Sequence, residues 1–134
     1  MNQLNLKAND EFSNKLLKWF DQHGRKDLPW QQDKTPYRVW VSEIMLQQTQ
    51  VSSVIEYYQR FMQSFPNIES LAEANEDKVL EHWAGLGYYA RARNLHKTAI
   101  IVVTELNSQF PNVLEDIVKL PGIDRSTAGG ILSI

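Results

Sequence analysis

The stretch that decides the fold runs from Thr35 to Gln50 and reads TPYRVWVSEIMLQQTQ. Thr35 can cap a helix, and Pro36 suits the first helical turn because a missing N–H has no cost there. The helix then continues through an almost unbroken apolar block, in which Glu43 is the one carboxylate. We therefore predict a helix from Pro36 onward that carries a single acid among apolar residues.

Glu43 is a candidate general acid. On a helix its neighbours are Val39, Trp40, Leu46 and Gln47. Such surroundings remove solvent from a carboxyl group, so its pKa should rise, as a proton donor working near neutral pH requires. The alternative is that Glu43 points to water, because glutamate is almost never fully buried without a partner.

Amides and a hydroxyl follow the acid, at Gln47, Gln48, Thr49 and Gln50. Groups of this kind can hydrogen-bond base edges or phosphates of a nucleic acid. The alternative for this run is a solvated helix face.

Helical periodicity continues along the chain, and no segment alternates with the period of two that marks a strand. The sequence therefore predicts an all-α class. Glycine and proline mark most of the breaks between the predicted helices. These helices cover residues 11–22, 36 onward, 51 to about 65, 68–74, 77–83, 90–106, 113–119 and 126–134.

Length and composition set further bounds. The chain has 134 residues, of which 43% are hydrophobic, and this is enough for one domain with a core. The net charge of -2 gives no bulk attraction to nucleic acid, so any such surface must be local. The chain has no cysteine, which excludes disulfides, thiolate metal sites and an iron–sulfur cluster within these residues.

The two ends of the sequence suggest where the protein is located and whether it is part of a longer chain. The first ten residues are polar and do not resemble a signal peptide, and no apolar run is long enough to cross a membrane, so we expect a cytoplasmic protein. The last predicted helix, 126–134, has no stop signal and stops inside an apolar run. We expect the chain to be the front part of a longer protein or a truncated product.

A second constellation, LPGIDRSTA at 120–128, lies between two predicted helices. A glycine turn at this place would let backbone N–H groups approach a phosphate, with a helix N-terminus behind them. The alternative is an ordinary corner between two helices.

A third constellation, WAGLGYYARARNL at 83–95, combines two glycines, two tyrosines and a basic run. Basic side chains attract phosphates, and a ring or a leucine at the tip of a turn can wedge between bases. The alternative is an aromatic core helix with a solvated basic side. The basic positions are Arg91, Arg93, His96 and Lys97.

Several motifs occur together in one order: LPW at 28–30, VWVSEIMLQQTQ at 39–50, GLGYYARARNLH at 85–96 and RSTAG at 125–129. With them, the chain resembles the N-terminal part of the MutY-type adenine DNA glycosylases of base-excision repair, from about Phe12 to Ile134. The segment 120–128 resembles the family's helix-hairpin-helix element, Leu-Pro-Gly-x-Gly followed by Thr-Ala. The second glycine of that pattern is Asp124 here, which brings a negative charge to a place where a DNA phosphate is expected.

The resemblance implies an endonuclease III-like helix-hairpin-helix glycosylase fold, of which residues 1–134 would be mostly the six-helix barrel lobe. The iron–sulfur lobe and the C-terminal domain of the complete enzymes would be absent. Complete family members carry a [4Fe-4S] cluster, whereas this chain would hold no cofactor and no metal. The expected partner is duplex DNA with an adenine opposite 8-oxoguanine, bound by a monomer associated with the bacterial nucleoid.

The resemblance also implies a reaction. The family flips adenine out of the duplex and hydrolyses its N-glycosidic bond. Glu43 matches the family's catalytic glutamate, which protonates N7 of the adenine. The family's catalytic aspartate, which stabilises the cationic sugar, lies beyond residue 134. We expect the activity of this chain alone to be impaired.

Other site residues follow from the same resemblance. The adenine pocket would be lined by Trp30, Leu46, Val51 and Ser126, with Arg25 or Lys26 near it. The contacts to the lesion and to DNA would come from Gln48, Thr49, Leu86, Tyr88, Gly122, Arg125 and Thr127.

Ser126 separates the rival functions. It occupies the position at which bifunctional relatives place a lysine that forms a Schiff base, and a serine cannot do that chemistry. This argues for a monofunctional glycosylase and against a glycosylase-lyase for oxidised pyrimidines. A rival from another class is a non-catalytic remnant that binds DNA or a protein partner.

Overall fold

The computed structural model describes residues 28–47 and 49–134. These residues form seven α-helices and one 3-10 helix with no strand among them, which confirms the predicted all-α class. The predicted helix at 11–22 lies outside the described residues, as do Arg25, Lys26 and Gln48. The elements are η2 (Pro29–Gln31), α2 (Pro36–Leu46), α3 (Val51–Ser64), α4 (Ile68–Glu73), α5 (Glu76–Trp83), α6 (Tyr89–Glu105), α7 (Leu114–Ile117) and α8 (Arg125–Leu132).

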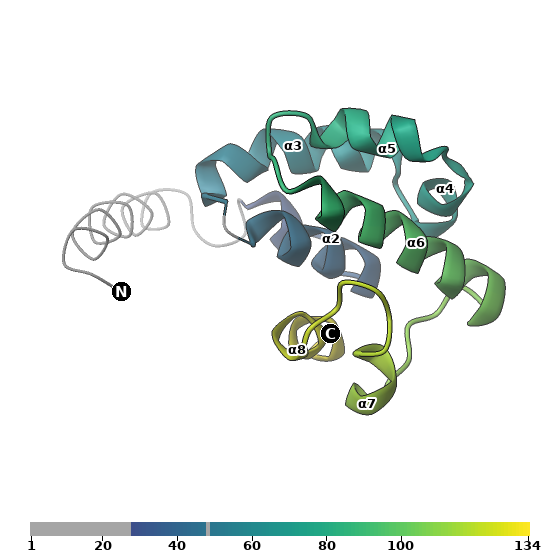
Figure 1. Ribbon diagram of the computed structural model, residues 1–134. Coiled ribbons are helices and arrows are strands. Elements are labelled where there is room, and N and C mark those ends of the chain that lie inside the picture. Colours follow the sequence, from purple (N-terminus) through teal and green to yellow (C-terminus); the bar gives the residue numbers. More distant parts are fainter. Residues whose placement is uncertain (1–27, 48) are drawn as a thin grey trace.

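Helices α2 and α6 run through the middle of the described part (Figure 1). Helices α3, α4 and α5 lie on one side of them, and α7 and α8 lie on the other side. The packing of α8 against α2 and of α4 and α5 against α6 buries a continuous apolar core. Its fully buried large side chains include Trp40, Met45, Tyr58, Phe61, Leu71 and Trp83.

Side-chain caps fix several helix starts. The Thr35 hydroxyl accepts a hydrogen bond from the Arg38 N–H at 3.1 Å, and Pro36 follows at the first helical position, as predicted. Asn67 and Asn75 accept from the N–H groups of Ser70 and Lys78 in the same way at α4 and α5. Each such cap satisfies one backbone donor that a helix leaves free and contributes about 1 kcal/mol.

Two elements differ from the prediction. Residues 29–31 form a 3-10 turn, which the sequence analysis did not predict. Helix α7 is shorter than the predicted 113–119, because the chain tightens into i→i−3 bonds such as Lys119 N–H to Asp116 O before it reaches Pro121.

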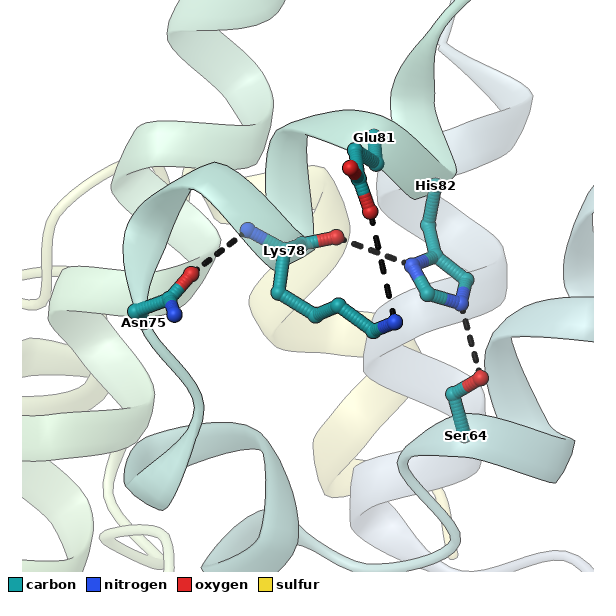
Figure 2. A network of polar contacts seen from close by, with 5 residues as sticks. All are labelled: Ser64, Asn75, Lys78, Glu81 and His82. Atoms are coloured by element: carbon teal, nitrogen blue, oxygen red, sulfur yellow. Dashed lines mark hydrogen bonds and ion pairs between the residues drawn. The ribbon is translucent and has the colours of Figure 1, made fainter.

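A polar network joins α5 to the end of α3 (Figure 2). The His82 Nδ1 lies 2.9 Å from the Lys78 carbonyl oxygen and its Nε2 lies 2.7 Å from the Ser64 hydroxyl. A carbonyl can only accept, so Nδ1 carries a proton, and in the neutral ring Nε2 accepts from Ser64. The same ring packs against Phe61 and Phe65, with centroids 6.0 and 4.9 Å away. His82 therefore fixes the α3–α5 pair by both polar and apolar contacts.

Within 28–47 and 49–134, the longest helix does not have the length and apolar character that crossing a bilayer would need.

Candidate functional site

Glu43 lies on α2 where this helix meets α8. The residues on both sides of it, Ser42 and Ile44, are buried, whereas Glu43 itself is half-buried. Its carboxyl group packs against the backbone of α8: a Cβ placed on Gly130 would stand 3.0 Å from the Glu43 Oε1. The absence of a side chain at Gly130 therefore makes the room that the carboxyl group occupies.

The pKa of Glu43 is raised above its ordinary value, first by burial and then by the negative charge of Asp124. The direction of this shift is the one that the apolar neighbours predict. Burial was visible in the sequence pattern. The contribution of Asp124 was not, because the two residues are far apart in the chain and meet only when α8 packs on α2.

Asp124 is the N-cap of α8. Its Oδ1 accepts a hydrogen bond from the Thr127 N–H at 2.8 Å, and this bond lowers the pKa of the carboxyl group. Asp124 therefore stays ionised and keeps its charge near Glu43. Its backbone is extended, with φ of -90°, while Gly122 takes the left-handed conformation of the hairpin with φ of 77°. The second position of the hairpin pattern does not need glycine in this fold.

Two further polar links tie α2 to its neighbours, and neither has a local signal in the sequence. The Gln47 amide donates to the Thr127 hydroxyl at 3.2 Å, which joins α2 to α8. The Arg91 guanidinium donates to the carbonyl oxygens of Ile44, at 2.8 Å, and of Gln47, which joins α2 to α6. Both links involve the C-terminal end of α2, the helix that carries Glu43.

The turn before α6 is tight, as its glycines predict. Gly85 and Gly87 have φ of 98° and 76°, and Tyr88 is also left-handed with φ of 56°. The Tyr57 hydroxyl donates to the Ala84 carbonyl at 2.8 Å and holds the start of this turn against α3. The Tyr88 side chain is 60% exposed, whereas Leu86 is 8% exposed and packs into the core.

The residues predicted to line an adenine pocket lie on four elements, which are η2, α2, α3 and α8. Trp30 is buried and meets Tyr58 edge to face, with centroids 5.6 Å apart. Leu46 and Val51 are half-buried at the α2–α3 junction, and Ser126 is exposed in the first turn of α8. η2, α3 and α8 each pack on α2, the helix that carries both Leu46 and Glu43.

The residues predicted to contact DNA differ in exposure. Gly122 and Arg125 are exposed and Thr49 is half-buried, with its hydroxyl donating to the Gln47 carbonyl at 3.4 Å. Thr127 is 2% exposed, and both its N–H and its hydroxyl have internal partners. In this conformation Thr127 supports the α2–α8 junction.

A hollow of about 840 Å³ lies elsewhere, where the start of α2, the start of α4 and the loop 108–112 meet the end of α8. Its walls include Thr35, Arg38, Glu69, Phe110 and Leu132, and Glu43 is not among its lining residues. This hollow is separate from the candidate site.

The chain does not fit the cluster that the resemblance implies for complete family members. An iron–sulfur cluster is held by cysteine thiolates, and the sequence has no cysteine. In the part of the chain that the structure describes, no three His, Asp or Glu side chains are placed to share a metal ion.

Comparisons with known proteins agree with the geometry. The family described as the HhH-GPD superfamily of base excision DNA repair proteins matches residues 41–130. The adenine DNA glycosylase of Buchnera aphidicola subsp. Baizongia pistaciae is 55% identical over 122 residues, which cover 91% of this chain and 35% of that protein. The human adenine DNA glycosylase is 47% identical over 132 residues, which cover 92% of this chain and 24% of that protein.

Solved structures show the same fold. A thermostable thymine-DNA glycosylase superposes with a TM-score of 0.73 at 23% identity, covering 98% of this chain and 60% of that one. A trapped endonuclease III–DNA covalent intermediate gives a TM-score of 0.70 at 18% identity, covering 100% of this chain and 60% of that one. The chain spans about a third of the length of the bacterial relative it matches and a smaller share of the human one. On the family match and the shared fold, the chain belongs to the HhH-GPD superfamily of base excision DNA repair proteins.

Proposed function

We propose that the chain supplies the general acid of an adenine DNA glycosylase that excises adenine opposite 8-oxoguanine. The observation that supports this most directly is the half-buried Glu43 carboxyl group, whose pKa is raised by burial and by Asp124. A carboxyl group that keeps its proton toward neutral pH can act as a general acid. The names of the bacterial and human relatives point to adenine as the base removed.

In the proposed reaction, Glu43 gives its proton to N7 of the flipped adenine. The C1′–N9 bond breaks, its electron pair goes to the adenine, and the base leaves as neutral adenine. The sugar becomes an oxocarbenium ion, which a water molecule attacks at C1′, and the Glu43 carboxylate takes a proton from that water. Ser126 offers no amine for a Schiff base, so the product is an abasic site without strand cleavage.

The DNA would be held by backbone groups and basic residues on two segments. The exposed Gly122 lies in the hairpin before α8, the exposed Arg125 is the first residue of α8, and the exposed Tyr88 belongs to the turn before α6. An aromatic side chain at such a turn can insert into a duplex. We further propose that the turn with Tyr88 and Thr49 contact the oxidised guanine. The complex would contain one copy of the chain and form in the bacterial cytoplasm.

The test is a single-turnover assay with the 134-residue chain in excess over a duplex containing one adenine opposite 8-oxoguanine. We expect abasic sites with the wild-type chain and a rate about 10²- to 10⁴-fold lower with Glu43→Gln, which is the usual loss when a general acid is removed. Duplex binding is measured in parallel by fluorescence anisotropy. Binding without excision would favour the non-catalytic DNA-binding alternative, and borohydride trapping of a covalent complex would favour a lyase.

A further inference from the structure

Arg91 lies in the first turn of α6 and reaches across to the end of α2. Its Nη1 donates to the Ile44 carbonyl oxygen at 2.8 Å and also to the Gln47 carbonyl oxygen. The Ile44 carbonyl oxygen also accepts from the Gln47 N–H and the Gln47 carbonyl oxygen from the Thr49 hydroxyl, so Arg91 is an additional donor to them. A cation is favourable at this end of a helix because of the helix dipole. One guanidinium group therefore closes the C-terminal end of the helix that carries Glu43.

The same guanidinium group lies beside two aromatic rings, one at the end of α5 and one in the turn before α6. Its central carbon is 5.0 Å from the centroid of the Tyr88 ring and 5.9 Å from that of Trp83. A cation over an aromatic face at these distances is attracted to it. Trp83 is fully buried, whereas Tyr88 is 60% exposed and strained into the left-handed region. Arg91 is thus a support for an exposed ring.

The charge of Arg91 has no counter-ion among residues 28–47 and 49–134, since no carboxylate there forms an ion pair with it. Its Nε and Nη2 are buried and, in the described part of the chain, lack hydrogen-bond partners. A cavity of about 140 Å³ adjoins it, lined also by Gln47, Asn94 and Gly122. Arg91 as a whole is half-buried, and burying nitrogen atoms of a cation without partners or a counter-ion costs free energy. If residue 91 served only to pack α6 on α2, an apolar side chain would do so at a lower cost in free energy.

We infer that Arg91 is a positioning residue, which fixes the turn after α2 and the Tyr88 ring relative to each other. This inference rests on the proposed function, in which both segments contact the lesion. With Arg91 in place, the turn that carries Gln47 and Thr49 and the turn that carries Tyr88 move as one unit. Discrimination between a duplex with adenine opposite 8-oxoguanine and an undamaged duplex then depends on a side chain that need not contact DNA.

Arg91→Met tests the inference, because it keeps an apolar stem and removes every donor and the charge. Arg91→Lys is the conservative variant, since an ammonium group can donate to both carbonyl oxygens and remains a cation. Arg60→Met is the matched control: Arg60 is exposed on α3, and its guanidinium carbon lies 4.9 Å from the centroid of the Tyr57 ring. It loses the same charge and the same kind of ring contact.

The first measurement is the ratio of dissociation constants for an undamaged duplex and for a duplex with adenine opposite 8-oxoguanine. Loss of one positive charge weakens binding to both duplexes alike and leaves this ratio unchanged. We expect Arg60→Met to keep the ratio, Arg91→Met to reduce it about tenfold, as loss of one 1.4 kcal/mol interaction does, and Arg91→Lys to restore most of it. Equal ratios for Arg91→Met and wild type would overturn the inference.

The second measurement is hydrogen exchange on the chain without DNA. It tests the clamp, by which we mean the hydrogen bonds from Arg91 to the Ile44 and Gln47 carbonyl oxygens, independently of the proposed function. We expect the amides of Gln47 and Thr49 to exchange faster in Arg91→Met, with amides in the middle of α3 unchanged. Unchanged exchange at Gln47 and Thr49 would overturn the clamp. A wild-type chain that does not distinguish the two duplexes would overturn the proposed function and the lesion role together, while exchange still decides the clamp. Should urea titration show that Arg91→Met does not fold, Arg91→Gln replaces it in both measurements, because it removes the charge and shortens the side chain while keeping a polar amide.

Discussion

The Glu43 carboxyl group rests directly on the backbone of Gly130, where a Cβ would stand 3.0 Å from Oε1 and 3.2 Å from the carboxyl carbon. Helix α8 is therefore one wall of the acid's surroundings, and the size of residue 130 sets the position of the proton donor. Gly129, the preceding residue, has nothing within 4 Å of the corresponding point. Gly129 is therefore a control position for Gly130.

Gly130→Ala should displace the Glu43 carboxyl group by a few tenths of an ångström and slow excision about tenfold, since small misplacements of reacting groups are costly. Gly129→Ala should leave the rate unchanged and raise the free energy of unfolding by about 0.5–1 kcal/mol, because alanine favours a helix over glycine. Single-turnover rates and urea titrations of both variants check this. Equal rates for the two variants would show that the contact does not control the acid.

Asp124→Asn should shift excision toward lower pH. Asparagine also caps helices, so α8 should persist, but the negative charge that raises the pKa of Glu43 is gone. Glu43 then loses its proton at a lower pH, and the falling limb of the rate profile moves down. The control is Asp116→Asn on α7, an exposed aspartate 3.7 Å from Lys119 that loses the same charge away from Glu43. A profile that moves as much with Asp116→Asn as with Asp124→Asn would contradict the assignment.

Glu43→Gln should stabilise the fold at neutral pH. The pKa of Glu43 is raised in the folded chain, so the carboxyl group favours folding while it is protonated and opposes it once ionised. Below the ordinary glutamate pKa of about 4.3 the folded and unfolded chains are both protonated, and the ionisation penalty is absent. The difference in urea midpoint between variant and wild type should therefore grow as the pH rises from 4 to 7. A difference that stays constant over this range would show that Glu43 ionises normally.

Gly85→Ala should destabilise the turn before α6 more than Gly87→Ala. Both glycines are left-handed, and an alanine in that region costs roughly 1 kcal/mol or more. At Gly85 the new Cβ would also clash with the Tyr57 hydroxyl oxygen, while at Gly87 nothing lies within 4 Å. Adding Tyr57→Phe should recover part of the loss at Gly85 and none of it at Gly87. Urea titrations of the single and double variants measure this coupling.

Much of the fold was predictable because its signals are local. Pro36 and Thr35 mark the start of α2, and the glycines at 85 and 87 mark the turn before α6. The raised pKa of Glu43 was also predictable, since its helical neighbours are apolar. The short 3-10 helix at 29–31 was missed because one turn around a proline has no periodicity to detect.

The polar support of the site was not predictable, because it depends on tertiary contacts. Arg91 bonds to carbonyl groups 44 and 47 residues away in sequence, and the basic run that contains it predicted only attraction to phosphate. Thr127 was predicted to contact DNA, and its burial between α2 and α8 follows from packing that no local pattern encodes. Asp124 looked like a defect in a glycine pattern, yet it caps α8 and acts on Glu43.

The sensitivity of Glu43 to a neighbouring negative charge has a consequence for how the acid is loaded. A duplex is a polyanion, and each phosphate brought to the hairpin acts on Glu43 with the same sign as Asp124. Binding of the duplex should then make Glu43 take up a proton from the buffer, so that the substrate itself promotes protonation of the general acid. Calorimetry in buffers with different ionisation enthalpies would record this uptake as a buffer-dependent heat, and Glu43→Gln would abolish it.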